Sequence, residues 1–334
     1  MSSLVMGVTL QRIYSSAAST LLEQHMREVS LLARSIDFEL ESMARIARDT
    51  ASFLQIDPQF NDAELYALLH ANAGSHAMIY GAAIAFEPYA YKSDRRLFAP
   101  YVFDRDLKQV DLSTLAEDYT EAGTPWYGAI KATGVSRWTE PYFDTGAGTM
   151  PIATYATPLL RGDAFIGVTT LDLRLDQLTR NLASLLDERQ FMIMSPSGRF
   201  VSHHDPAMIL AASIQDEALR QGSAEYDAMV SRIMKGERGF SAIAGLRQDG
   251  SSGGDTDDDR VEGNTWVFHT PITATNWHLA TFIAEDELMD PLTEQINIAL
   301  LGMSLTILLI FGLVWLVSSR LTRPIKQLEA AVSD

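Results

Sequence analysis

The apolar residues follow a helical period near the N-terminus of the chain. Residues 15–56 contain no proline or glycine and consist mostly of good helix formers, which predicts one long helix. Apolar side chains recur in it with the a/d spacing of a coiled coil. They are Leu22, Val29, Ile36 and Met43 at one position, and Met26, Ala33, Leu40 and Ala47 four residues further on. This seam predicts a dimer stalk, a stripe that packs on the chain's own sheet, or both at different heights of the helix.

After Pro58 the pattern changes to short apolar runs of strand length, separated by turn residues. The first group predicts an antiparallel sheet with helices over residues 57–180, and its candidate strands are 78–86, 97–103, 151–160 and 165–173. A helix over 175–186 leads to a second region, 181–290. Its candidate strands are 191–194, 240–246, 265–271 and 278–283, with a helical stretch over 214–234. The predicted fold class is α+β, with two tandem antiparallel sheet units behind the long helix.

An uncharged, largely apolar run covers residues 296–319, and basic residues follow it directly. A helix needs about 20 apolar residues to cross the hydrocarbon core of a bilayer, so this run predicts a transmembrane helix. Lys and Arg gather on the C-terminal flank, at 320, 323 and 326, whereas carboxylates precede the run. An excess of basic residues marks the cytoplasmic side. We therefore expect the residues before the span to lie outside the cytoplasm.

Both termini indicate that the sequence is part of a longer protein. Residues 1–14 are mostly apolar but too few to span a bilayer, and they lack the basic start of a signal peptide. They are expected to be the remnant of a first transmembrane helix, with an interfacial N-terminus as the alternative. Residues 320–334 begin an amphipathic pattern at Pro324 that continues through Leu328 and Val332. Such a linker requires a following output domain.

Composition narrows the possible partners and chemistries. The formal net charge of −17 argues against nucleic-acid binding, which needs clustered basic side chains. The absence of cysteine excludes disulfides, thiolate catalysis and cysteine-bound metals. No glycine-rich phosphate loop occurs. The adjacent His203 and His204 are expected to be surface polar residues, because neighbouring side chains on an extended segment point to opposite faces.

Two local patterns resemble functional motifs but lack what those motifs require. Asp255, Asp257 and Asp259 have the spacing of a calcium loop, yet Arg260 and Trp266 stand where Gly and Glu are needed. Residues 250–254 match the G-x-S-x-G nucleophile elbow, but they lie in a Gly/Ser/Asp loop rather than between a strand and a helix. The sequence therefore predicts no catalytic site, no cofactor and no metal centre, and the chain is not expected to be an enzyme.

Several segments together resemble a known family of bacterial receptors. They are AIAFEPYAY (83–91), FAPYVFDRD (98–106), TPWY (124–127), WTEPYFD (138–144), ATYATP (153–158) and GVTTLDL (167–173). With the membrane span and the Pro324/Leu328 pattern, they resemble transmembrane receptors with a double Cache sensor and a HAMP linker. The sensor is most similar to that of RsbU-type receptors, in which a PP2C/SpoIIE-type serine phosphatase usually follows. The resemblance implies two PAS-like units and a HAMP start at 320–334. It also implies a location in the bacterial inner membrane, with the sensor in the periplasm or outside the cell.

The resemblance also implies a ligand pocket in the membrane-distal unit, 57–180, lined by aromatic rings and closed by carboxylates. Amino-acid-binding relatives hold the ligand carboxylate with an Arg two residues before the Trp, and Thr124 stands there in this chain. Aromatic faces with carboxylates suit an ammonium group. A small amine or other amine-bearing metabolite is therefore the expected ligand. The predicted site residues are Trp126, Tyr127, Trp138, Tyr142, Asp144, Tyr155 and Asp172.

Alternatives to this hypothesis concern both the site and the function. Trp126, Trp138 and Tyr155 could be core aromatics, and Asp172 a capping or turn residue. The predicted function is the ligand-sensing part of a homodimeric membrane receptor, paired through its N-terminal helix. The output domain could instead belong to a histidine kinase or a chemoreceptor. A membrane-anchored enzyme acting outside the cytoplasm is the alternative of another class.

Overall fold

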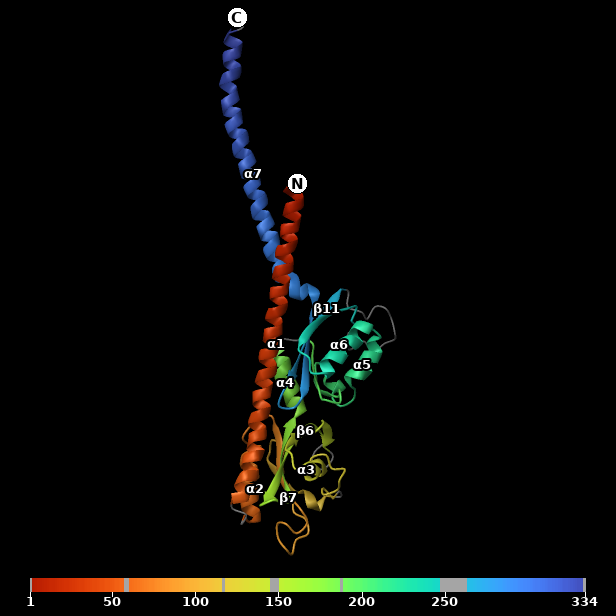
Figure 1. Cartoon of the computed structure of the whole chain (residues 1–334). Coiled ribbons are helices and arrows are strands. Elements are labelled where there is room, and N and C mark those ends of the chain that lie inside the picture. Colours follow the sequence, from red (N-terminus) through yellow and green to blue (C-terminus); the bar gives the residue numbers. More distant parts are fainter. Residues whose placement is uncertain are drawn as a thin grey trace. The chain divides into compact units, whose positions relative to one another are not determined.

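The structure is a computed structural model, and it describes residues 2–56, 60–115, 118–144, 150–186, 189–246 and 263–332. The chain forms two compact units. Residues 23–284 make up the larger unit, which holds both sheets, and the ends of the chain make up the other. Figure 1 shows the course of the chain through its helices and strands. The acidic loop 255–259 and the 250–254 motif lie outside the described residues.

The first sheet confirms the predicted antiparallel arrangement of the distal region. Its neighbouring strands follow the order β3-β2-β1-β7-β6-β4, and β5 also pairs with β6. The long hairpin of β6 and β7 forms its centre, because these apolar, β-branched runs pair over their whole length. The strands are β1 (Ile79–Phe86), β2 (Pro100–Phe103), β3 (Lys108–Asp111), β4 (Arg137–Trp138), β5 (Tyr142–Asp144), β6 (Met150–Arg161) and β7 (Ala164–Arg174).

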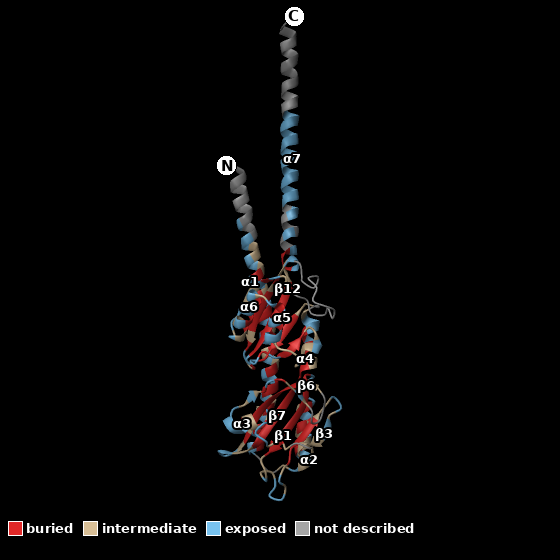
Figure 2. Cartoon of the chain, turned by 90° about the vertical axis from the view of Figure 1, so that its right-hand side faces the viewer, coloured by how far each residue is buried: buried red, intermediate tan, exposed pale blue. Residues whose placement is uncertain are grey.

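The second sheet is also antiparallel, with the order β10-β11-β12-β8-β9. The helix α4 (Leu175–Leu186) connects the two sheets along the chain, as predicted. The predicted helical stretch contains two helices, α5 (Ile214–Gln221) and α6 (Ala224–Met234), separated by Gly222 at φ +61°. The strands are β8 (Phe191–Met194), β9 (Phe200–His203), β10 (Gly239–Ala244), β11 (Asn264–Ile272) and β12 (Trp277–Ala284). Figure 2 shows that the strands of both sheets are largely buried.

The helix α1 (Ser2–Ile56) runs along both sheets, and its contacts decide between the two predictions for its apolar seam. Its Ala47 carbonyl accepts a hydrogen bond from Thr169 Oγ1 in β7 at 2.9 Å. Asp37 accepts from Thr273 Oγ1 and from Ala274 N after β11. All eight seam residues are buried within this single chain, and Leu40 and Met43 are 0% exposed. The seam therefore packs on the chain's own sheets.

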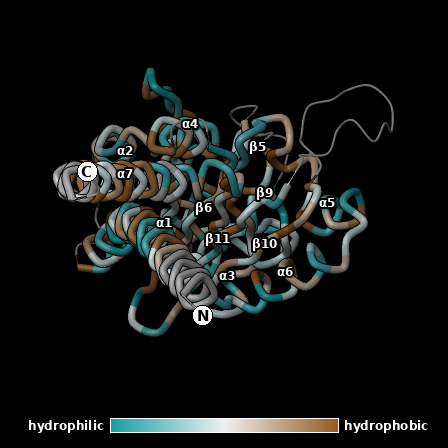
Figure 3. The backbone as a smooth tube through the Cα atoms, turned by 90° about the horizontal axis from the view of Figure 1, so that it is seen from above, coloured by the Kyte–Doolittle hydropathy of each residue, from teal (hydrophilic) through white to brown (hydrophobic). Residues whose placement is uncertain are grey.

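The helix α7 (Glu285–Val332) contains the predicted membrane span. Within it, Leu300–Val317 is long and apolar enough to cross a bilayer, and none of this window is buried in the protein. It is the one such candidate among the residues described. Figure 3 shows apolar residues along this helix.

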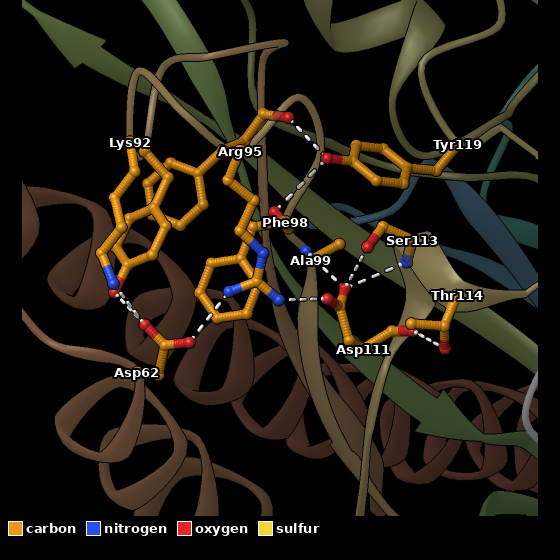
Figure 4. A network of polar contacts seen from close by, with 11 residues as sticks. Asp62, Lys92, Arg95, Phe98, Ala99, Asp111, Ser113, Thr114 and Tyr119 are labelled. Carbon is orange, nitrogen blue, oxygen red and sulfur yellow. Dashed lines mark hydrogen bonds and ion pairs between the residues drawn. The ribbon is translucent and has the colours of Figure 1, made fainter.

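A network of ion pairs fixes the long connection between β1 and β2. Arg95 donates to Asp62 at 2.8 Å, near the start of α2 (Asp62–Ala73), and to Asp111 at the end of β3 at 2.6 Å (Figure 4). Its guanidinium also lies 3.7 Å from the ring centroid of Phe98. The same Asp111 accepts from Ala99 N at 2.9 Å. The connection is thus fastened at one edge of the sheet, away from its central strands.

Candidate ligand-binding site

The distal sheet has two faces with different coverings. Strand alternation and register place Gly81, Thr154 and Asp172 side by side on one of them. The helix α3 (Gly128–Thr133) packs on that face through Ile130, so we call it the α3 face. The opposite face carries Thr169 and lies against α1, so we call it the α1 face.

A buried carboxylate, Asp172, forms the centre of a polar cluster on the α3 face. Tyr101 donates its hydroxyl hydrogen to Asp172 Oδ2 at 2.7 Å, and Thr154 donates to Oδ1 at 2.7 Å. The Tyr142 hydroxyl lies 2.7 Å from Thr154 Oγ1. Asp172 itself is 5% exposed. Four strands therefore contribute to the cluster, and Asp172 is a strand residue rather than a cap or a turn residue.

The environment of Asp172 brings its ionisation close to neutral pH. Burial raises the pKa of this carboxyl to about 7, although the hydrogen bonds from Thr154 and Tyr101 lower it, and the nearby charge of Asp144 raises it further. Burial, with the charge of Asp172, also raises the pKa of the Tyr101 and Tyr142 hydroxyls, which keeps both as hydrogen-bond donors. A bound cation would stabilise the ionised form of Asp172.

Trp126 and Tyr127 lie at the other end of the α3 face. Tyr127 is fully buried in a cluster with Ala85, Ala156 and Val168, and its hydroxyl donates to Glu87. The half-buried Trp126 meets the Tyr127 ring edge-on at 6.0 Å. Val168 and Asp172 are four residues apart on β7, or about 13 Å at 3.3 Å per residue. Because Tyr127 is fully buried in this cluster, it is a core aromatic. The aromatic residues and Asp172 lie at opposite ends of the same face.

Trp138 and Tyr155 lie on the α1 face instead. Their rings meet edge-on at 5.4 Å, and Tyr155 accepts a hydrogen bond from Arg48 Nη1 of α1 at 2.8 Å. Trp138 also approaches Trp277 of the second sheet at 6.1 Å. The structure therefore brings together Tyr142, Asp144 and Asp172 on the α3 face, with Trp126 and Tyr127 at its far end, and it separates Trp138 and Tyr155 from them.

Tyr101, Thr154 and Gly81 belong to the cluster but were not predicted as site residues. A Cβ atom at Gly81 would lie 2.5 Å from the Tyr101 ring, so the glycine makes room for the tyrosine to reach Asp172. The motifs FAPYVFDRD and ATYATP contain Tyr101 and Thr154, yet their spacing does not indicate which side chains share a face with Asp172. Only the register of β1, β2, β6 and β7 indicates this.

The floor of the α3 face is made of small side chains, unlike the equivalent region of the second sheet. Its central positions are Gly81, Ala83, Ala85, Thr154, Ala156 and Thr170. In the second sheet, the face under α5 and α6 is filled by a core cluster of larger apolar residues. That cluster includes Met192, Met194, Phe200, Tyr226, Met229, Ile243, Val267 and Phe282. The first sheet therefore has shorter side chains under its covering helix, and the second is packed with large ones.

Three basic side chains around the α3 face have acidic partners, whereas Arg137 of β4, opposite Ala156, donates to the hydroxyl of Thr133 at 3.1 Å. Lys131 of α3 pairs with Glu87 at 2.8 Å, and Arg96 pairs with Asp118 at 2.9 Å. Arg174, two residues beyond Asp172, pairs with Asp176 at 3.0 Å. At these three cations a ligand carboxylate would have to displace a carboxylate, which leaves Arg137, whereas a ligand cation meets Asp172 directly.

The histidine pair of the second sheet differs from expectation. His203 is 0% exposed, and its ring centroid lies 4.2 Å from that of His204. The prediction of a surface residue was wrong for His203, because every residue of β9 is buried and neither face of the strand meets solvent. His204, just beyond the strand, is half-buried. Burial and the neighbouring His204 lower the pKa of His203 to about 4. No cluster of metal-binding side chains occurs among the residues that the structure describes.

Comparison with known proteins identifies the type of fold. Residues 65–180 match the family model of the methyl-accepting chemotaxis protein-like first PDC sensor domain. No curated protein sequence is similar enough to count as a match. Residues 65–180 are thus similar to a PDC, or Cache-like, sensor domain of the chemoreceptor type.

Solved structures share this fold over most of the chain. The extracellular domain of mmHK1S-Z3, a protein assigned as a histidine kinase, has a TM-score of 0.67 at 18% identity, covering 82% of this chain and 98% of its own. The ligand-binding domain of the Pseudomonas fluorescens chemoreceptor CtaA with L-isoleucine has a TM-score of 0.57 at 18% identity, covering 83% and 97%. The ligand-binding domain of the Pseudomonas aeruginosa PAO1 amino acid chemoreceptor PctB with L-Gln has a TM-score of 0.55 at 18% identity. The match covers 84% of this chain and 98% of that domain. These likenesses confirm the α+β fold.

Proposed function

We propose that the chain is the extracytoplasmic sensor of a bacterial membrane receptor and that it binds a small amine on the α3 face of its distal sheet. The main support is the burial of the Asp172 carboxylate, which accepts hydrogen bonds from Tyr101 and Thr154. This burial raises the pKa of Asp172 to about 7. A buried carboxylate is costly unless a cation or strong donors compensate it. An ammonium ligand would supply both a charge and donors.

The ligand would place its ammonium group against Asp172, with Tyr142 and Asp144 beside it. Asp144 shares this face with Asp172 by strand register, and its negative charge raises the pKa of Asp172. The small floor residues leave the apolar part of the ligand to extend toward Trp126. Charge-assisted hydrogen bonds contribute about 1.5 to 3 kcal/mol each, so loss of Asp172 should weaken binding at least tenfold.

An amino acid is the second candidate ligand, because two similar structures hold L-isoleucine and L-Gln. The α-ammonium group could use Asp172 in the same way. The carboxylate is harder to accommodate, since Thr124 cannot replace the bidentate charge of an arginine and Lys131 is already paired. This difference makes an amine without a carboxylate the favoured ligand.

Titration calorimetry on the whole chain in lipid nanodiscs tests the ligand class. The compounds form matched sets that share one carbon skeleton, such as propylamine, propionate and alanine, extended to longer and aromatic members. We expect heat from amines, and its loss in Asp172→Asn. Asp216→Asn is the matched control, because this aspartate is exposed on α5, next to the second sheet, and the substitution should leave binding unchanged. Binding of carboxylates but not amines would contradict the proposal.

Other parts of the receptor hypothesis concern the membrane and the output. Leu300–Val317 would span the inner membrane, residues 1–14 would be the remnant of a first span, and residues 320–334 would begin a HAMP linker. The sequence resemblance favours a serine phosphatase as output, whereas the similar structures favour a histidine kinase or chemoreceptor. Sequencing the gene beyond Asp334 distinguishes these outputs, and an unrelated soluble enzyme there would contradict all of them.

A homodimer through α1 also remains part of the proposal, but its contact must differ from the predicted seam. That seam is buried within the chain, so it is not free to pair. The outer side of α1 instead exposes Leu31 and Phe38, which are 58% and 74% exposed and seven residues apart. A seven-residue spacing keeps both side chains on one stripe of a helix. We propose that this stripe meets its counterpart in a second copy.

A further inference from the structure

A three-residue segment, 138–140, connects the candidate site to the second sheet. Its middle residue, Thr139, is bound to Thr154 in both directions. Thr139 N donates to the Thr154 carbonyl at 2.8 Å, and Thr154 N donates to Thr139 Oγ1 at 3.0 Å. Thr154 is also the residue whose hydroxyl donates to Asp172. A change at Asp172 therefore acts on Thr154, whose backbone is fixed to this segment.

The first residue of the segment, Trp138, reaches the second sheet through ring contacts. Its indole lies between Tyr155, at 5.4 Å, and Trp277, at 6.1 Å. Its Nε1 is buried and has no acceptor within the described part of the chain. Packing alone therefore holds the ring, at about 0.5 to 1.5 kcal/mol per aromatic pair. Such a contact can shift without breaking a hydrogen bond.

The last residue of the segment adds a polar contact to the same sheet. Glu140 accepts a hydrogen bond from Ser197 Oγ at 2.7 Å, in the turn between β8 and β9. Trp277, which is 1% exposed, is the first residue of β12. That strand ends at Ala284, and α7 begins at the next residue. The second sheet thus connects segment 138–140 to the start of the helix that carries the candidate membrane span.

We propose that segment 138–140 transmits the state of the Asp172 site to β12, with Trp138 as the positioning residue. This inference rests on the proposed function, because it gives the mechanism by which that site acts. Ligand binding shifts a conformational equilibrium only when contacts differ between two states. The differing contact is the packing of Trp138 on Trp277, which follows displacement of Thr154 when Asp172 changes its partner.

Fluorine NMR of the whole chain in nanodiscs, labelled with 5-fluorotryptophan, tests the coupling without any ligand. Asp172→Asn serves as the perturbation, because it removes the carboxyl charge at nearly constant shape. We expect it to move the Trp277 resonance. The same perturbation in a Trp138→Leu background should leave the Trp277 resonance unmoved. Trp266→Leu is the matched control, since Trp266 belongs to the same sheet and its ring packs on Phe240, and the shift should persist there.

A second variant keeps the test decisive if Trp138→Leu fails to fold. Thr139→Val removes the hydroxyl that accepts from Thr154 N and preserves the shape of the side chain, and it should reduce the Trp277 shift. A full shift in either folded variant, or no shift from Asp172→Asn alone, would overturn the coupling. Neither outcome affects the amine titration, so failure of this inference is distinguishable from failure of the proposed function.

Discussion

Replacement of Asp172 by asparagine should make the protein's stability respond differently to pH. The folded state raises the pKa of this carboxyl to about 7 from 3.8. Between these values the unfolded chain is ionised while the folded chain holds the proton, so the free energy of unfolding falls as pH rises. Asparagine does not titrate. The stability of Asp172→Asn relative to wild type should therefore increase through this range and become constant above about pH 7.

The size of the effect follows from the same two pKa values. The gap from 3.8 to about 7, at about 1.4 kcal/mol per unit, corresponds to about 4 kcal/mol between pH 4 and 8. Relaxation of the site around the ionised carboxylate would reduce this value, so a gain above about 2 kcal/mol supports the argument. Such a difference is large compared with a typical surface substitution of about 0.5 kcal/mol.

Urea unfolding monitored by tryptophan fluorescence, at intervals from about pH 4 to 8, measures this difference. Comparison of variants at each pH removes the contribution of other titrating groups. Asp62→Asn is the matched control, because hydrogen bonds from Tyr91 and Lys92 lower the pKa of Asp62 to about 2. Its stabilising contribution is lost only below pH 4, so its difference from wild type should stay constant. A constant difference for Asp172→Asn as well would refute the buried-carboxylate argument.

Three further predictions concern the site and the dimer. Amine affinity measured by calorimetry should fall about tenfold per pH unit below pH 7, because the ligand competes with a proton; a flat profile would contradict this. Gly81→Ala should lower the free energy of unfolding by about 1 to 3 kcal/mol, since its Cβ would meet the Tyr101 ring at 2.5 Å. Gly123→Ala, with open space around it, should lower it little. Equal losses of stability would contradict the close approach at Gly81. Phe38→Glu should dissociate the dimer in sedimentation experiments and Leu219→Glu, 83% exposed on α5, should not; a persistent dimer would exclude the proposed stripe.

Periodicity predicted most of the fold because the strands and helices are long and strongly apolar. Segments such as Phe191–Met194 and Leu175–Leu186 were placed at their actual bounds. The short strands β3, β4, β5 and β9 were not recognised, since each contains polar residues and lacks the continuous apolar run of the equally short β8. The α1 seam showed which residues would be buried but not by what, because a heptad stripe fits a sheet as well as a second helix.

The site could be predicted only in part, because sequence motifs do not specify the face of a strand. Tyr142, Asp144 and Asp172 share the α3 face, whereas Trp138 and Tyr155 pair with each other on the opposite one. Tyr101 was missed because its contact with Asp172 depends on a register between strands 71 residues apart in sequence. Its proximity to Asp172 follows from tertiary pairing and not from local spacing.

A crystal structure of the protein with the amine identified by titration tests the central claim most directly. We expect the ligand on the α3 face of the distal sheet, with its nitrogen within hydrogen-bonding distance of Asp172 and its apolar part directed toward Trp126. A ligand bound on the α1 face beside Tyr155, or among the large side chains under α5 and α6, would contradict it.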